Sequence, residues 1–223
     1  FIYALNNSSD SKRKWLINSV KNGEKKELDR VINYVKEIGG IDYTKNQIKN
    51  FDKFLKSINH FLNKDGVTVL KIKKRNKNFH ARFSAKKRWY AYKIINRRSP
   101  LTIDANRAWC VHKILDTKKM QSESASFLGK HDLNAFRSAH CQSKSSIRTI
   151  DDIIINIKNE SIFIEVVAKS FLHSQVRIMV GTLVDIAKEN INRSILDIIN
   201  SKNREAAGQT APANGLYLKK IDY

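Results

Sequence analysis

The pattern that most restricts the fold is a succession of strand, turn, strand and helix. Residues 151–157 and 161–169 are rich in β-branched side chains, and Asn159-Glu160 separates them as a turn. Residues 172–187 follow at once, with apolar side chains at helical spacing. A hairpin with a helix beside it predicts an α+β fold whose sheet is mostly antiparallel and flanked by helices.

Other segments carry weaker patterns of the same two kinds. Helices are expected where apolar residues recur at helical spacing, in residues 24–37, 47–62 and 195–199. A further helix is expected between the capping residue Asp116 and Gly129. Strands are expected in residues 1–5, 67–73, 89–95 and 216–221, with one more apolar run at residues 15–17.

The charge balance is the first indication of function. The chain has 42 Lys and Arg against 21 Asp and Glu, a formal net charge of +21. Such an excess is typical of proteins that bind nucleic acid, although a Lys-rich composition alone also produces it. No apolar run is long enough for a membrane span, so we expect no membrane partner. Cys110 and Cys141 are too far apart to form a paired-thiol motif.

One stretch concentrates this charge. Residues 71–88 hold nine Lys or Arg residues and no acidic residue. Cations neutralise phosphates, and aromatic side chains among them can stack on exposed bases. We expect Phe79 and Phe83 to plug the core, and the polar side chains of this stretch to contact RNA: Lys73, Lys74, Arg75, Lys77, His80, Arg82, Lys86, Lys87 and Arg88.

Five blocks in a fixed order resemble the tRNA pseudouridine synthase A family. The first is residues 79–92, FHARFSAKKRWYAY. The others are LGKHD at 128–132 leading to Phe136-Arg137 and CQSK at 141–144; FLH at 171–173 with Val176-Arg177 and Val180-Gly181; AAG at 206–208 with TAPA at 210–213; and GLYL at 215–218. The resemblance extends from about Ile58 to Tyr223.

The resemblance implies a pseudouridine-synthase-like fold of two related α/β halves that share the sheet. Residues 1–95 would form a divergent, partial N-terminal half with an inserted helix near residues 21–41, and residues 96–223 the C-terminal half. It also implies a homodimer that binds the anticodon arm of tRNA and needs no cofactor. In the family an Asp carboxylate lets uracil detach from ribose and rejoin through carbon.

Two site residues follow from the matched blocks. Tyr90 corresponds to the tyrosine that packs against the target uracil, and Arg177 to the arginine that pairs with the nucleophilic Asp. An Arg within an apolar helix calls for a carboxylate partner when partly buried, whereas an Arg pointing to solvent needs none. Arg137 and His173 lie in matched blocks and are expected to contact RNA.

The family's nucleophile loop, Gly-Arg-Thr-Asp-Ala-Gly, is absent. Its positional counterpart is residues 6–12, NNSSDSK, where Asp10 replaces the nucleophile and Ser8 stands where the Arg would be. An Asp before a Ser is also ordinary turn chemistry, so both interpretations of Asp10 stay open.

Other chemistries have weaker support. His131, His140, His173 and Cys141 lack the compact spacing of zinc modules, so no metal is expected. Ser174 beside His173 has neither an acidic partner nor the glycines of a hydrolase elbow.

Two functions therefore stand side by side. The first is an active tRNA-uridine isomerase of the bacterial cytoplasm or the mitochondrial matrix. The second is a catalytically inactive RNA-binding component of a ribonucleoprotein, such as a mitochondrial ribosome. The altered Asp10 loop favours the second function, and the presence of Tyr90 and Arg177 favours the first.

Overall fold

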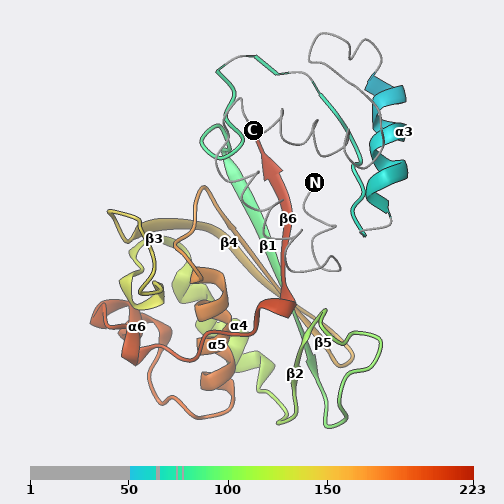
Figure 1. Cartoon of the computed structure of the whole chain (residues 1–223). Coiled ribbons are helices and arrows are strands. Elements are labelled where there is room, and N and C mark those ends of the chain that lie inside the picture. Colours follow the sequence, from blue (N-terminus) through green and yellow to red (C-terminus); the bar gives the residue numbers. More distant parts are fainter. Residues whose placement is uncertain (1–50, 64–65, 74, 77) are drawn as a thin grey trace. The chain divides into compact units, whose positions relative to one another are not determined.

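The computed structural model describes residues 51–63, 66–73, 75–76 and 78–223 (Figure 1). The chain divides into two compact units, Phe1–Ala85 and Lys86–Tyr223, and each is described by itself. The elements expected at residues 1–5, 15–17 and 24–37 lie outside the described residues. The division of the family's two halves at residue 95 stays a prediction.

The first unit contains helix α3, Phe51–Leu62. Its buried residues Phe54, Ile58 and Leu62 are spaced four apart and so share one face of the helix. Asp52 in the first turn and His60 in the last complement the helix dipole. The prediction of a helix over residues 47–62 is confirmed from Phe51 onward, and residues 47–50 lie outside the description.

The predicted strand at residues 67–73 is wrong. Val67 and Val69 are buried, as a strand pattern requires, but the segment forms no ladder with a neighbour. The Asn59 side chain instead hydrogen-bonds with both backbone groups of Val69. Its Nδ2 donates to the Val69 carbonyl at 2.8 Å, and its Oδ1 accepts from the Val69 N–H at 2.7 Å. A side-chain amide thus satisfies the backbone where a partner strand would have done so.

The second unit is built on a mixed sheet. Its strands are β1 Lys87–Asn96, β2 Trp109–Val111, β3 Gly129–Asp132, β4 Ile147–Lys158, β5 Ser161–Ala168 and β6 Leu216–Asp222. They follow the order β2-β1-β5-β4-β3, and β6 also pairs with β1. Among these described strands only β1 and β2 are parallel. The predicted α+β fold with a mostly antiparallel sheet is confirmed.

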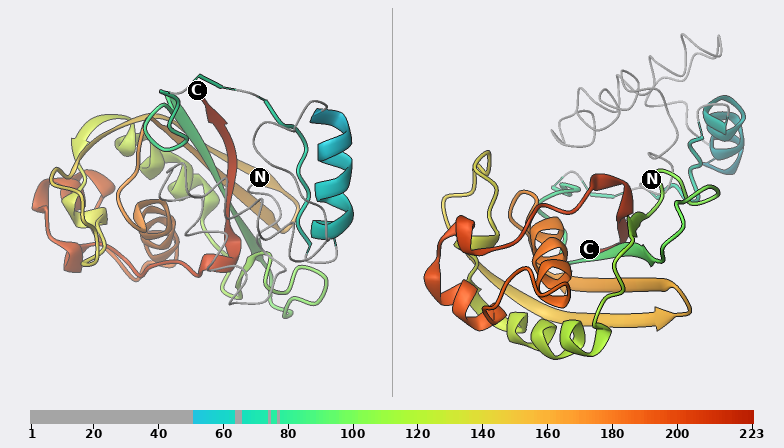
Figure 2. Two further views of the ribbon diagram at one scale, coloured as in Figure 1. Left: turned by 45° about the horizontal axis from the view of Figure 1, so that its top comes forward. Right: turned by 90° about the horizontal axis from the view of Figure 1, so that it is seen from below.

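The β4–β5 hairpin forms as predicted (Figure 2). Asn159 adopts a φ of 53° at its turn, a backbone conformation that Asn tolerates better than most residues. The predicted strands at residues 89–95 and 216–221 are confirmed as β1 and β6. Strands β2 and β3 were not predicted because neither is long enough to show an alternating pattern.

Helix α4, Thr117–Ser124, begins as predicted, because the Asp116 side chain accepts from the Lys119 N–H at 2.9 Å. It does not run to Gly129. A 3-10 turn at Ala125–Phe127 follows it, and Gly129, with a φ of 93°, opens β3 instead.

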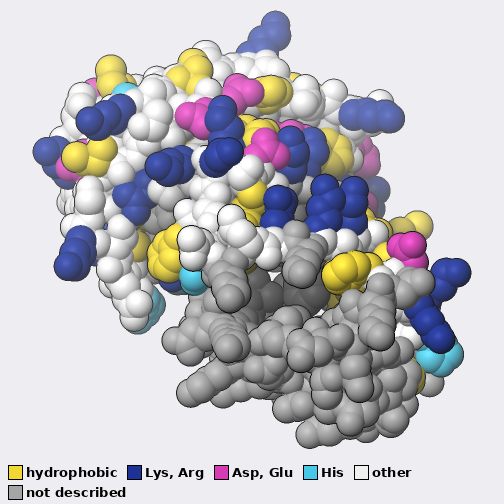
Figure 3. All heavy atoms as spheres, turned by 90° about the horizontal axis from the view of Figure 1, so that it is seen from above, with side chains coloured by type: hydrophobic (Ala, Val, Ile, Leu, Met, Phe, Trp, Pro, Cys, Tyr) yellow, Lys and Arg dark blue, Asp and Glu magenta, His cyan; other side chains and the backbone are white. Residues whose placement is uncertain are grey.

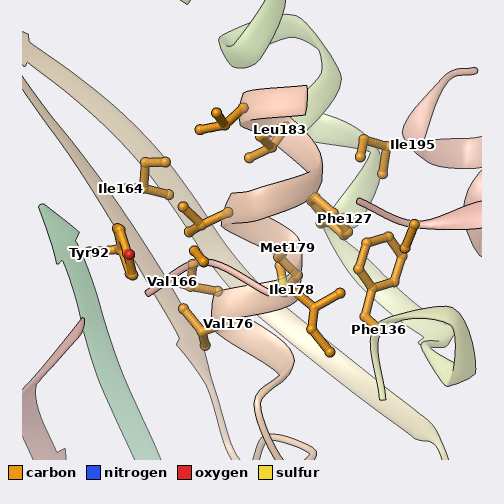
Figure 4. Packing of buried hydrophobic residues seen from close by; sticks show 14 of the residues in the cluster. Tyr92, Phe127, Phe136, Ile164, Val166, Val176, Ile178, Met179, Leu183 and Ile195 are labelled. Carbon is orange, nitrogen blue, oxygen red and sulfur yellow. The ribbon is translucent and has the colours of Figure 1, made fainter. Parts of the chain in front are cut away.

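The core lies around helix α5, Gln175–Ala187, whose residues are buried apart from the half-buried Arg177. Figure 4 shows α5 between the sheet residues Tyr92, Ile164 and Val166 on one side and Phe127 and Phe136 on the other. This double burial explains why apolar residues occur on all sides of the helix. Helix α6, Ile195–Ser201, adds Ile195 to the core and starts with a capping box of Ser194 and Asp197. Of the helices in the described part of the chain, none combines the length and apolar character that a membrane span requires.

Candidate active site

Strand β1 carries Tyr90 and Tyr92 on the face of the sheet that α5 covers. Tyr90 pairs with Val166 of β5 on one side and Leu218 of β6 on the other. Its ring meets Phe171 edge to face, with the centroids 5.2 Å apart. Burial raises the pKa of the Tyr90 hydroxyl, and the charge of Arg88 opposes this with a smaller effect. Tyr90 is therefore a neutral, apolar surface at physiological pH.

Arg177 lies in the first turn of α5. The Oε1 of Gln175 accepts the N–H of Leu172 at 2.8 Å and so fixes the turn that precedes it. Arg177 exchanges two hydrogen bonds with one residue: its Nε donates to the Ala211 carbonyl at 2.6 Å, and its own carbonyl accepts the Ala211 N–H at 3.1 Å. The direction of this side chain is thus determined by a backbone segment far along the chain.

We call that segment, residues 207–213, the strap. It lies directly on α5, because a Cβ on Gly181 would come within 1.8 Å of the Gln209 carbonyl oxygen. The Gly208 N–H donates to Thr182 Oγ1 at 2.9 Å. Gln209 donates its backbone N–H and its Nε2 to the two carboxylate oxygens of Asp185, each at 3.0 Å. A buried acid is thereby satisfied by neutral donors.

Tyr92 connects the strap to the sheet. Its hydroxyl donates to the Pro212 carbonyl at 2.6 Å. Burial raises the pKa of this hydroxyl, and the nearby charge of Arg177 lowers it by less. Because Tyr90 and Tyr92 are two apart on one strand, Arg177 and Tyr90 are presented on the same side of the sheet.

The expected carboxylate partner of Arg177 is not among the described residues. Asp10 lies outside them, and the ion pairs within the described ranges do not include Arg177. Asp185 is already bonded to Gln209. The assignment of Asp10 as nucleophile stays a prediction.

Arg137 and His173 come together beside the start of α5. The Ser138 N–H donates to the His173 carbonyl at 3.2 Å, and the His173 N–H donates to Cys141 Sγ at 3.4 Å. Arg137 is half-buried, and its Nη2 donates to the Cys141 carbonyl at 2.8 Å. Burial raises the pKa of the Cys141 thiol, but the backbone N–H groups of His173 and Ser143 and the charge of Arg137 outweigh it and hold this pKa below its usual value. Arg137 thus braces this loop, while His173 is exposed.

The candidate metal ligands serve other purposes. The Nε2 of His131 lies 2.7 Å from the Leu128 carbonyl. Within the described ranges, no three His, Cys, Asp or Glu side chains gather closely enough to hold a metal ion.

The basic residues at the start of β1 are partly engaged within the second unit. Lys87 lies 3.5 Å from Asp151, and Arg88 donates to the Lys169 carbonyl. Lys220 lies 4.4 Å from the centroid of the Trp89 ring. Lys86 is exposed. Figure 3 shows many Lys and Arg side chains on one face of the protein, with a few acidic side chains between them.

The other predicted RNA contacts belong to the first unit, apart from Lys74 and Lys77, which lie outside the description. Lys73, Arg75 and Arg82 are exposed, and His80 is half-buried. The expectation that Phe83 plugs the core is wrong, since 74% of it is exposed. Phe79 is half-buried, with the Arg75 guanidinium 5.4 Å from its ring centroid.

Sequence reasoning missed the residues that hold the strap. Asp185 could have indicated them in the sequence, because it is the one acidic residue of helix α5. A carboxylate at a buried position requires donors, and the loop between α6 and β6 could have supplied them.

Comparisons with known proteins identify relatives of the chain. A family model described as tRNA pseudouridine synthase matches residues 124–223. The chain is 50% identical over 177 residues to a protein of Ehrlichia chaffeensis named tRNA pseudouridine synthase A, an alignment that covers 78% of this chain and 72% of the relative. Proteins with the same name are 45% identical in Anaplasma phagocytophilum, over 87% of this chain and 76% of the relative, and 48% identical in Wolbachia pipientis, over 75% and 69%.

Proposed function

Since the chain belongs to the tRNA pseudouridine synthase A family, we propose that it isomerises uridine to pseudouridine in the anticodon arm of tRNA. The observation that carries this proposal is the placement of Tyr90 and Arg177 on one side of the sheet. Both are residues that the family's site requires, and both are held by contacts that fix their direction.

Each residue has a distinct part in the reaction. The target nucleotide leaves its stack, at a cost of about a few kcal/mol, and its uracil packs against the ring of Tyr90. A carboxylate, which we assign to Asp10, attacks carbon 1′ of the ribose while the bond between that carbon and the uracil nitrogen breaks. Carbon 5 of the uracil then forms a bond to carbon 1′ and displaces the carboxylate, and the hydrogen of carbon 5 is released as a proton. Arg177 pairs with the carboxylate, as the resemblance to the family implies.

The electrostatics of the described site support these parts. A Tyr with a raised pKa stays neutral and presents no charge to the uracil. Arg177 uses its Nε for the strap, so the direction of its guanidinium is set before substrate binds. Preorganisation of this kind lowers the reorganisation that the reaction would otherwise require.

Release of tritium from tRNA labelled at carbon 5 of uracil tests the proposal directly. The wild-type protein should release tritium from a tRNA transcript, and an Asp10→Ala variant should not. No release from the wild-type protein would disprove the isomerase function. Unchanged release from the variant would disprove only the assignment of Asp10.

We extend the proposal to the substrate, the oligomeric state and the cellular compartment. The substrate is tRNA, and the protein acts as a homodimer in the bacterial cytoplasm. The bacterial origin of the relatives supports this compartment over the mitochondrial matrix. Their names favour the enzyme over the alternative of an inactive ribonucleoprotein component.

A further inference from the structure

Phe83 is a large aromatic residue that the fold leaves in solvent. Its exposed fraction is 74%, whereas Phe127 and Phe136 are fully buried. A single exposed apolar side chain is common on protein surfaces. The surroundings of this ring decide whether it marks a ligand surface.

The loop that carries Phe83 is locally well bonded. The Ser84 N–H donates to the His80 carbonyl at 2.8 Å, and the His80 N–H donates to Ser84 Oγ at 3.0 Å. The Nδ1 of His80 accepts the N–H groups of both Arg82 and Phe83, at 3.1 and 3.3 Å. Four hydrogen bonds thus close a compact turn, and Phe83 projects from an organised backbone.

The surroundings of the ring identify the chemistry of the ligand. The His80 ring lies 4.4 Å from the Phe83 ring, centroid to centroid, tilted by 41°. The guanidinium of Arg82 lies 5.5 Å from the ring centroid. Exposed Lys73 and Arg75 belong to the same unit, and the sequence from residue 71 to residue 88 contains no acidic residue. A flat apolar surface among cations suits a flat ring attached to a phosphate chain.

We propose that the His80–Phe83 turn is a stacking site for an unpaired base of RNA. Phe83 covers one face of the base, and Arg82 neutralises a neighbouring phosphate. Paired bases within a duplex offer no free face, so the site selects single-stranded or looped nucleotides. This inference rests on the proposed function, because the turn would bind the same RNA substrate. It involves none of the residues assigned to the chemistry.

Binding measurements on three variants test the site. Phe83→Ala removes the ring, Phe83→Trp keeps a stacking surface, and Leu70→Ala is the control, because Leu70 is an equally exposed apolar residue of the same unit at 77%. The probes are a tRNA transcript, an oligouridylate, and a ribose-phosphate oligomer of equal length that lacks bases. Circular dichroism verifies that each variant is folded.

Phe83→Ala should bind the tRNA and the oligouridylate about 5- to 150-fold more weakly, the range measured for loss of one stacked base. Its affinity for the base-free oligomer should be unchanged, and Phe83→Trp and Leu70→Ala should match the wild type. Equal losses for all three probes, or no loss for any, would overturn the stacking site. If the wild type released no tritium from tRNA, the proposed function would fail, and the oligouridylate comparison would still decide the stacking site.

Discussion

The strap on α5 and the His80–Phe83 turn differ in how much of their surroundings is buried. Beneath the strap, the buried carboxylate of Asp185 accepts two hydrogen bonds from Gln209. Around the turn, cations and an aromatic ring are exposed. The first arrangement fixes a direction, and the second offers a surface.

This difference separates two requirements of an enzyme that acts on a large polyanion. The role proposed for Arg177 requires its side chain to be held within a narrow range of orientations, and a packed surrounding with satisfied hydrogen bonds provides this. Affinity for RNA needs charge that a phosphate can approach, and this charge works without a single geometry. Variants in the strap should therefore change turnover or stability, and variants near the turn should change binding.

The sharpest test of this comparison is Arg177→Ala. It should lower kcat by about 100- to 1,000-fold, as loss of one preorganised charged group does, with little change in KM. Single-turnover tritium release measures both. Arg193→Ala, which removes an exposed Arg after α5, is the control and should leave both constants unchanged. A rise in KM alone would place Arg177 in binding instead.

Gly181→Ala should be the largest purely structural change. The added Cβ would lie 1.8 Å from the Gln209 carbonyl oxygen, so either the helix or the strap must move. We expect a loss of about 3 kcal/mol in the free energy of unfolding, measured by urea titration. A loss below about 0.5 kcal/mol would contradict the close contact between the strap and α5.

Asp185→Ala should cost about 1–2 kcal/mol, because it removes two partly buried hydrogen bonds from the exposed residue Gln209 to a carboxylate. Asp185→Asn keeps one acceptor oxygen and should cost less. Exposed Asp152 provides the control, and Asp152→Ala should stay within about 0.5 kcal/mol of the wild type. If the two alanine variants were equally stable, the strap would not depend on Asp185.

Tyr92→Phe should cost about 1 kcal/mol at neutral pH, since the Pro212 carbonyl loses its donor. The raised pKa of Tyr92 adds a pH dependence. In the unfolded chain this hydroxyl ionises near its ordinary pKa of 10.0, while the folded form resists ionisation. Stability from this group is complete below pH 10 and is lost as the pH rises further. Unfolding titrations at several alkaline pH values should therefore show a shallower decline for Tyr92→Phe than for the wild type.

The smallest effect is expected from Arg75→Ala in the exposed region. It should reduce the slope of log affinity for tRNA against log salt by about 1, with no change in kcat. Fluorescence anisotropy over a range of salt concentrations measures the slope. Lys56→Ala on α3 tests whether any exposed cation of the first unit has the same effect.

Periodicity predicted what local sequence determines. The β4–β5 hairpin, α5 and β6 formed where alternation and helical spacing placed them, and the blocks around Tyr90 and Arg177 identified the family. These features depend on side chains that are close together in the sequence, and periodicity reflects such local relations.

The contacts that orient Arg177 could not be predicted in this way. Ala211 and Arg177 are far apart in sequence, and neither residue type specifies the other. The wrong strand at residues 67–73 has the same cause, because Asn59 satisfies the backbone of Val69 from a neighbouring helix. Phe83 was assigned to the core wrongly, because the residue type alone does not show whether an apolar side chain is buried or lies on a ligand surface.

The pairing of β1 with β6 has a consequence for biosynthesis. Residues 87–92 hydrogen-bond with residues 216–222, so the edge of β1 stays open until the ribosome has made residue 222. The strap emerges just before that strand. A nascent chain therefore contains Tyr90 well before Leu218 and the strap, which complete its surroundings, have been made.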